Sequence, residues 1–327
     1  MSRRSSIVST MIVLTFVSGA SGCSRATSLT PGARSGATGL HVNPQSLGSW
    51  NTKAPMPTPR WGMAAGVVNG ILYVVGGCCD SNRNFLNTVE AYDPKTDSWT
   101  TKASMPTKRD GLAAGVVNGI LYAIGGYNGA WYLNTVEAYN PTTNTWTTKA
   151  PMPAAQYLLA AGVVNGILYA VGGHPDDLNT LYAYDPATNT WTTKASMPTG
   201  RFALSASVHG RTLYAVGGWN NGPRSTIQAY DSATNTWAGA APMPTARAFL
   251  ATRFVGDILY AVGGSQYSGY LDTVEAYNPA TNTWTTRLSM PTKRAGLAAG
   301  VVNGILYAVG GLNGSGFLNT VEAFSPR

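Results

Sequence analysis

Charge, cysteine and histidine are all scarce in this chain. Of its 327 residues only 11% are charged, and there are three cysteines and three histidines. With Arg3, Arg4, Arg25 and Arg34 near the N-terminus set aside, the rest carries about +4 and contains no run of Lys or Arg. A surface that follows nucleic-acid phosphates needs clustered cations, so we expect no nucleic-acid partner.

Sequence motifs for catalysis and cofactor binding are also lacking. The glycine pairs end apolar runs instead of opening helices, so they do not form a nucleotide-binding fingerprint. We find no Ser–His–Asp arrangement and no phosphate-cradling loop. We therefore expect no cofactor and favour a binding function over an enzymatic one.

Long apolar runs are scarce too. The longest apolar stretch lies at the N-terminus. Residues 1–22 combine Arg3 and Arg4 with a short apolar stretch and small residues, which is typical of an export signal. This stretch is too short to span a bilayer comfortably as a permanent helix. "ASGC" at 20–23 resembles a bacterial lipobox with Ala20 in place of the usual Leu, and this resemblance implies a lipid on Cys23.

We expect an exported protein of the periplasm, cell envelope or extracellular space, which contacts a membrane only through that anchor. Secretion or periplasmic release without a lipid is the alternative. Residues 23–47 are rich in Ser, Gly, Thr and Ala and show no period, so we interpret them as a flexible tether. The folded domain is then expected over residues 48–327.

A repeat fills that domain. Gly-Gly pairs begin at 76, 125, 172, 217, 263 and 310, and Trp recurs at 50, 99, 146, 191, 237 and 284. Both series step by 45–49 residues, the period of a four-stranded propeller blade. Each unit contains four expected strands, a to d, written "GLAAGVV", "ILYAVGG", "NTVEAY" and "TWTTKA".

The turns agree with this assignment of strands. Four a–b turns are Asn-Gly, which suits a type I′ hairpin, and Gly210-Arg211 and Gly256-Asp257 suit type II′. Strand a is rich in Gly and Ala because innermost strands crowd around an axis.

The di-glycine, the following Tyr, the Trp and the "MPTKR" segment that opens each unit resemble the kelch repeat over residues 48–327. The resemblance implies an all-β fold, a six-bladed kelch β-propeller with four antiparallel strands per blade. The sixth unit ends at "VEAFSPR" without a strand d, whereas "LGSWNTKA" at 47–54 has the strand d pattern. We predict that this N-terminal strand completes blade six and closes the circle.

Loops of a propeller separate onto two faces. The b–c loops and d–a crossings share one face, and the b–c loops differ most between units, as binding loops on a rigid scaffold do. An arginine ring opens strand a on that face, with Gln156 in the third unit; its members are Arg60, Arg109, Arg201, Arg247 and Arg294. In resembling kelch domains this region lines the channel mouth, which implies an acidic ligand.

An intrablade pairing is the alternative for the arginine ring. Strand c carries Glu90, Glu137, Glu275 and Glu322 in units that also hold the ring arginine, and two long side chains can bridge two strand spacings. Arg201 has Gln228 in place of the Glu, which makes it the best candidate for an unpaired, ligand-facing cation.

Most aromatic residues recur at fixed unit positions, so we assign them to the core or to loop anchoring. Tyr127, Trp131, Trp219 and Tyr267 are loop aromatics without a counterpart in every unit. Such rings stack on sugars or grip peptides, and plugging a loop is the alternative. We include them with the arginine ring as candidate ligand-binding residues.

Metal and thiol chemistry have little support. His41 precedes the repeats, His174 lies in a b–c loop and His209 precedes an a–b turn on the opposite face, so no metal site is expected. Galactose oxidase, another kelch propeller, is therefore no guide to copper binding here. Cys78 and Cys79 are either a strained vicinal disulfide or two free thiols.

The sequence thus predicts a monomeric, non-enzymatic scaffold that binds an acidic protein or glycan on its b–c and d–a loop face. The alternative is a carbohydrate-active kelch enzyme such as a sialic-acid epimerase, which the resemblance allows. No acid–base pair in the loops supports that enzyme.

Overall fold

The computed structural model describes residues 47–80, 84–267 and 269–326. The predicted signal peptide, Cys23 and the tether up to residue 46 lie outside these ranges. All long regular elements within them are strands, and no described helix is long and apolar enough to cross a membrane.

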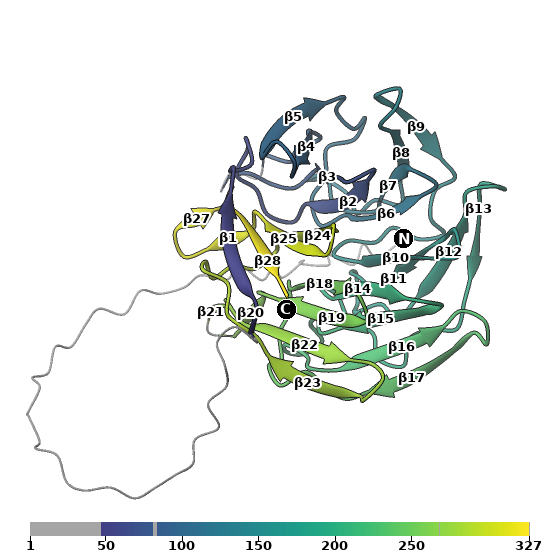
Figure 1. Cartoon of the computed structure of the whole chain (residues 1–327). Coiled ribbons are helices and arrows are strands. Elements are labelled where there is room, and N and C mark those ends of the chain that lie inside the picture. The colour runs from purple at the N-terminus through teal and green to yellow at the C-terminus, as the bar shows by residue number, and fades with distance from the viewer. Residues whose placement is uncertain (1–46, 81–83, 268, 327) are drawn as a thin grey trace, which may run out of the picture. The chain divides into compact units, whose positions relative to one another are not determined.

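Six four-stranded antiparallel sheets surround a central axis, as predicted (Figure 1). The innermost strands, a, are short and small-residue-rich: β2 (Ala64–Val68), β6 (Ala113–Val117), β10 (Ala160–Val164), β14 (Ser205–His209), β18 (Ala251–Val255) and β24 (Ala298–Val302). Strands b pair with them: β3 (Ile71–Val75), β7 (Ile120–Ile124), β11 (Ile167–Val171), β15 (Thr212–Val216), β19 (Ile258–Val262) and β25 (Ile305–Val309).

The outer half of each blade holds strands c and d. Strands c are β4 (Val89–Asp93), β8 (Val136–Asn140), β12 (Leu181–Asp185), β16 (Ile227–Asp231), β22 (Val274–Asn278) and β28 (Val321–Ser325). Strands d are β5 (Ser98–Lys102), β9 (Thr145–Lys149), β13 (Thr190–Thr193), β17 (Thr236–Ala240), β23 (Thr283–Thr286) and β1 (Ser49–Lys53). Two b–c loops add short hairpins, β20 (Ser265–Gln266) with β21 (Gly269–Tyr270) and β26 (Leu312–Asn313) with β27 (Gly316–Phe317).

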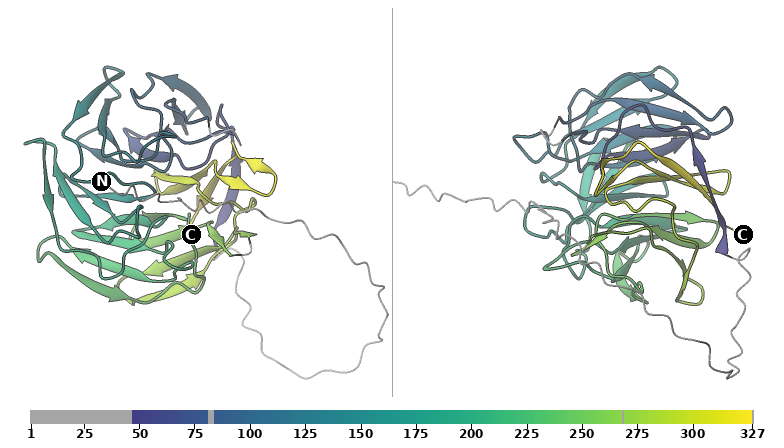
Figure 2. Two further views of the ribbon diagram at one scale, coloured as in Figure 1. Left: turned by 180° about the vertical axis from the view of Figure 1, so that it is seen from behind. Right: turned by 90° about the vertical axis from the view of Figure 1, so that its left-hand side faces the viewer.

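Blade six closes as predicted. Strand β1 pairs antiparallel with β28, with Trp50 opposite Phe324, in a sheet ordered β1-β28-β25-β24. The early strand and the chain's last strand lie side by side in both views of Figure 2. The sheet that joins the two ends therefore has the same four strands as the other blades.

Adjacent blades are tied by the repeated tryptophans. Each strand d Trp donates its indole N–H to a backbone carbonyl at the end of the preceding blade, at 2.8–2.9 Å. The Trp50 indole donates to Leu288 O, so β1 also fastens blade six to blade five. The ring faces of each Tyr–Trp pair, such as Tyr92 and Trp99 at 5.1 Å, fill the outer core.

The turn chemistry expected from the sequence is present. Asn69 and Gly70 have φ of 50° and 79°, as a type I′ turn requires, and the other Asn-Gly turns repeat these values closely. Turn residues therefore fix the hairpin register that aligns all loops on the two faces.

Candidate functional site

The arginine ring is fully buried inside the blades. All five side chains have 0% relative exposure. Each Nη1 donates to the carbonyl of the first di-glycine residue at 3.0–3.2 Å and so holds the end of strand b. Gln156 donates to Gly172 O at 3.1 Å from the same position in blade three.

The intrablade pairing accounts for the ring charges. Nη2 lies 2.6 Å from the carboxylate in Arg60–Glu90 and 2.7 Å in Arg247–Glu275 and Arg294–Glu322, and Arg109 pairs with Glu137. Thr58, Thr107, Thr245 and Thr292 donate their hydroxyls to these carboxylates. Burial lowers the pKa of Arg60, Arg109 and Arg294, and the paired glutamate opposes this shift.

The structure differs from the expectation for Arg201. It lacks a carboxylate partner, as expected, yet it is buried and donates to Gly217 O at 3.2 Å and Gln228 Oε1 at 2.6 Å. Burial and the neighbouring Arg224 lower its pKa to about 10. A glutamine oxygen accepts a guanidinium hydrogen bond as a carboxylate does, so Arg201 faces its own blade and not a ligand.

A closed ring of backbone hydrogen bonds surrounds the axis at the start of the innermost strands. One residue per blade donates its N–H to the carbonyl of its counterpart in the preceding blade, at 2.7–3.0 Å. We call these residues the mouth ring: Gly62, Gly111, Leu158, Ala203, Phe249 and Gly296. All six have positive φ, between 51° and 64°.

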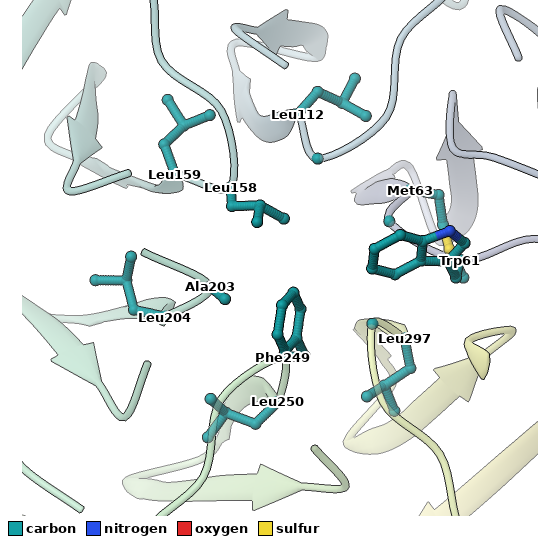
Figure 3. Close-up of a pocket in the computed structure, with 13 residues that line it drawn as sticks. Trp61, Met63, Leu112, Leu158, Leu159, Ala203, Leu204, Phe249, Leu250 and Leu297 are labelled. Carbon is teal, nitrogen blue, oxygen red and sulfur yellow. The ribbon is translucent and has the colours of Figure 1, made fainter. Parts of the chain in front are cut away.

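Three members of the mouth ring are not glycine, although positive φ is costly for bulky residues. Leu158 and Phe249 point into the opening together with Trp61 (Figure 3). The Trp61 and Phe249 rings lie 6.1 Å apart between centroids. The mouth is a cavity of about 90 Å³, lined by these side chains and by the backbone of the mouth ring.

Around the mouth, aromatic rings form a continuous series over blades one to four. Tyr127 contacts Phe85 and Tyr157 at 5.5 and 5.7 Å, and His174 contacts Tyr132 and Phe202 at 5.3 and 5.6 Å. Trp219 and Tyr267 form a separate edge-to-face pair at 5.4 Å. We define the aromatic sector as these rings with Trp131: Phe85, Tyr127, Trp131, Tyr132, Tyr157, His174, Phe202, Trp219 and Tyr267.

Exposure differs among the four predicted loop aromatics. Trp131 is 74% exposed and Tyr267 is 65% exposed, the highest values among the described large hydrophobic side chains. Tyr127 and Trp219 are half-buried, and each forms an isolated bridge to a d–a crossing residue, Asp110 and Phe202 respectively. Trp131 and Tyr267 therefore offer the most surface to a partner, while Tyr127 and Trp219 support the loops.

The same positions in blades five and six are small or aliphatic. There the bridging pairs are Ala248–Ser265 and Ala295–Leu312, against Tyr157–His174 and Phe202–Trp219 in blades three and four. The bridging positions are thus asymmetric, with rings in blades three and four and small or aliphatic residues in blades five and six.

Histidine and cysteine do not assemble a reactive centre in the part of the chain that is described. No group of three or more His, Cys, Asp or Glu side chains is close enough to hold a metal ion. His209 stacks on Phe254 at 5.0 Å on the opposite face. Cys78 and Cys79 are free thiols, so the disulfide alternative is not present, and burial raises the pKa of both.

Sequence comparison agrees with this architecture. Residues 37–173 and 159–327 match the profile of the KLHDC2/KLHL20/DRC7 Kelch-repeats domain. The chain belongs to this Kelch-repeats family. No curated protein matches the chain in sequence.

Solved structures support the same propeller. The structure of YjhT superposes with a TM-score of 0.72 at 19% sequence identity, over 83% of this chain and 96% of that one. At this identity the likeness concerns the fold alone. A Kelch-repeats propeller is, in general terms, a scaffold for binding or an enzyme, and Kelch-repeats propellers generally mediate protein–protein contacts.

Two features of this Kelch-repeats domain escaped the sequence reasoning. Trp61, Tyr157 and Phe202 follow the ring arginine or Gln156 directly and face the loops, and alignment of the units shows that this position varies. Arg253 occupies the third position of strand a, where the other units have Gly or Ser. A comparison of equivalent positions in the six units that looked for residues differing from the repeat would have found both features.

Proposed function

We propose that the protein is a non-enzymatic scaffold that binds a protein partner through the aromatic sector of its loop face. The observation that carries this proposal is the exposure of Trp131 and Tyr267, at 74% and 65%, in the b–c loops of blades two and five. Exposed aromatic side chains supply large contact area at little entropic cost and often dominate binding energy.

The aromatic sector suits such a contact because its rings are supported from below. Tyr127 donates its hydroxyl to Gly129 O at 2.7 Å, and Asn128 Oδ1 accepts from Trp131 N at 2.8 Å. Trp131 is thus presented on a held loop, which reduces the ordering cost of binding.

A glycan is the alternative ligand, since sugars also stack on exposed rings. The acidic character expected of the ligand loses its support, because the ring arginines that suggested it are buried. The sialic-acid epimerase alternative would require turnover of sialic acid, and absence of anomer conversion by NMR would exclude it.

A pull-down from an envelope extract tests the proposal. We expect wild-type protein to retain a partner. The double variant Trp131→Ala, Tyr267→Ala should bind this partner at least about tenfold more weakly, because it lacks two side chains that anchor the interface. Leu288→Ala is the matched control, because Leu288 is 44% exposed but lies outside the aromatic sector.

Retention of the same partner by the double variant would contradict the proposal. A glycan array in which only wild type and Leu288→Ala bind would assign the ligand to the glycan class instead. Circular dichroism of all variants checks that each is folded.

We further propose that the protein is exported and anchored through a lipid on Cys23, which lies outside the described residues. Mass spectrometry of the mature protein checks this proposal. A lipid mass on an N-terminal Cys23 supports the anchor, and an unmodified Cys23 within an intact chain contradicts it.

A further inference from the structure

The third residue of each innermost strand is small in five of the six blades: Gly66, Gly115, Gly162, Ser207 and Gly300. Close blade packing explains this, because a Cβ on Gly66 would lie 2.5 Å from Leu121 Cδ1 of the next blade. Blade five instead has Arg253 at this position on β18. The repeat does not require this arginine.

The Arg253 guanidinium lies in the channel. Its Nη1 donates to Thr252 O at 2.8 Å, and its Nη2 donates to Ala65 O of blade one at 3.4 Å. The side chain therefore reaches from blade five past blade six and lines an axial cavity of about 120 Å³.

Unlike four of the ring arginines, Arg253 forms no ion pair with any described carboxylate. Its contacts are backbone carbonyls, which leave most of its five N–H donors available. Desolvation lowers the pKa of Arg253 to about 10, so it stays cationic at neutral pH. A buried charge without a counter-charge is costly, and an anion in the cavity removes that cost.

Hydroxyl groups accompany the cation. Ser205 lines the same cavity, and its Oγ accepts from Thr252 N at 3.0 Å and from Thr252 Oγ1 at 2.9 Å. The Thr252 hydroxyl lies 3.0 Å from Ser207 Oγ. Because Ser205 Oγ accepts both bonds, its own proton is left for a further hydrogen bond.

One level of residues joins this cavity to the mouth. The two cavities share six lining residues, so they are successive levels of one channel: Met63, Leu112, Leu159, Leu204, Leu250 and Leu297. The ends of these side chains pack inside the blades, for example Leu112 Cδ2 beside Gly76 and Leu204 Cδ2 beside Gly172. The rings of Trp61 and Phe249 lie at the level of the mouth (Figure 3). The deeper cavity is lined by Arg253 and by alanines of the innermost strands, such as Ala65, Ala114 and Ala161.

We propose that the axial cavity beside Arg253 binds the carboxylate of a short aliphatic acid. The guanidinium and the Ser205 hydroxyl donate to the carboxylate, and the alkyl chain lies against the alanines of the innermost strands. The narrow mouth ring excludes bulky ligands such as sugars. This site is separate from the aromatic sector and does not depend on it.

Titration of the full chain with sodium butyrate, followed by saturation-transfer NMR and calorimetry at constant ionic strength, tests the site. We expect wild type to bind butyrate more tightly than formate, because only butyrate also reaches the alanines of the innermost strands. Arg253→Ser places the blade-four residue in blade five and should weaken butyrate binding at least tenfold. Arg211→Ser is the matched control, because the Arg211 side chain is 63% exposed in the a–b turn of blade four. This variant should bind butyrate as tightly as wild type does.

Wild-type affinity in Arg253→Ser, or no saturation transfer to butyrate in wild type, would overturn the proposal. Chloride competing as strongly as butyrate would overturn the carboxylate assignment. If Arg253→Ser fails to fold, the wild-type protein alone decides the test. An equal rise in its melting temperature with butyrate and with uncharged n-butanol would contradict a cationic site. The Trp131→Ala, Tyr267→Ala variant should bind butyrate normally, which separates this result from that of the loop-face proposal.

Discussion

At the scale of single residues, charge in this propeller serves the scaffold. The ring arginines hold the strand b to strand c corner of five blades, and four of them are neutralised by a glutamate on strand c. The joint absence of Arg and Glu from blade three pointed to this pairing in the sequence. Burial was not predictable, because a motif position does not show whether a long side chain turns into its blade or toward the axis.

Removing one partner of a buried pair should be costly. Arg247→Ala leaves Glu275 buried without its counter-charge, so we expect a loss of about 3–5 kcal/mol in the free energy of unfolding. Arg211→Ala, at an exposed pair with Asp231, should lose no more than about 1 kcal/mol. Urea denaturation of both variants measures this contrast, and equal losses would contradict the scaffold role.

One carboxylate gives a pH-dependent prediction. Asp97 accepts hydrogen bonds from the Tyr92 hydroxyl and from Ala54 N, which lower its pKa below the ordinary 3.8. A carboxylate whose pKa is lower in the folded state than in the unfolded state stabilises the fold at pH values above its ordinary pKa. This stabilisation is lost as the pH falls through the folded-state pKa. Blades two to five carry Asn at this position, for example Asn144.

The loss of stability caused by Asp97→Asn should therefore be larger at pH 7 than at pH 3. Asn144→Asp introduces a carboxylate at the equivalent position of blade two, so the stability of this variant should fall in the same way as the pH is lowered. Denaturant midpoints at the two pH values measure the difference. A constant offset between wild type and Asp97→Asn at both pH values would count against this carboxylate.

At the scale of strands and turns, local sequence patterns were sufficient to predict the structure. Each strand is bounded by turn residues whose conformations are nearly fixed, such as Asn69-Gly70, so the four-strand unit followed from the repeat. The spare strand pattern at 47–54 predicted the closure of blade six by β1.

Strand β1 can be tested by truncation. Removing residues 1–54 leaves β28 as an unpaired edge and deletes the Trp50–Leu288 bond between blades, so unfolding should occur at a markedly lower temperature. Removing residues 1–46 keeps β1 and is the control. Identical melting of the two truncations would refute the closure.

The mouth ring is the element that the repeat did not reveal. Its hydrogen bonds join residues of different blades, and Leu158, Ala203 and Phe249 occupy a conformation that their residue types do not indicate. Only the positions of Gly62, Gly111 and Gly296 carried a local signal.

Ala203→Gly should relieve the strain of positive φ and raise the free energy of unfolding by about 1 kcal/mol. Ala206→Gly, three residues on in β14, should instead lower it by about 0.5–1 kcal/mol, because its backbone is ordinary strand. Chemical denaturation compares the two. A loss of stability in Ala203→Gly as large as in Ala206→Gly would argue against strain in the ring.

At the scale of the whole molecule, both proposed binding sites rest on departures from the sixfold repeat. The residue after the ring position is aromatic in blades one, three and four, as Trp61, Tyr157 and Phe202, and the aromatic sector extends over blades one to five. Periodicity predicted the scaffold but could not show which loop residues of different blades meet, because those contacts are made across blade boundaries.

Hydroxyl-radical footprinting of the protein with and without its captured partner tests most directly the claim that the aromatic sector is the binding face. We predict that Trp131 and Tyr267 become protected from oxidation on binding, while Leu288 stays as reactive as in the free protein. Unchanged oxidation of Trp131 and Tyr267 in the bound state would contradict the account.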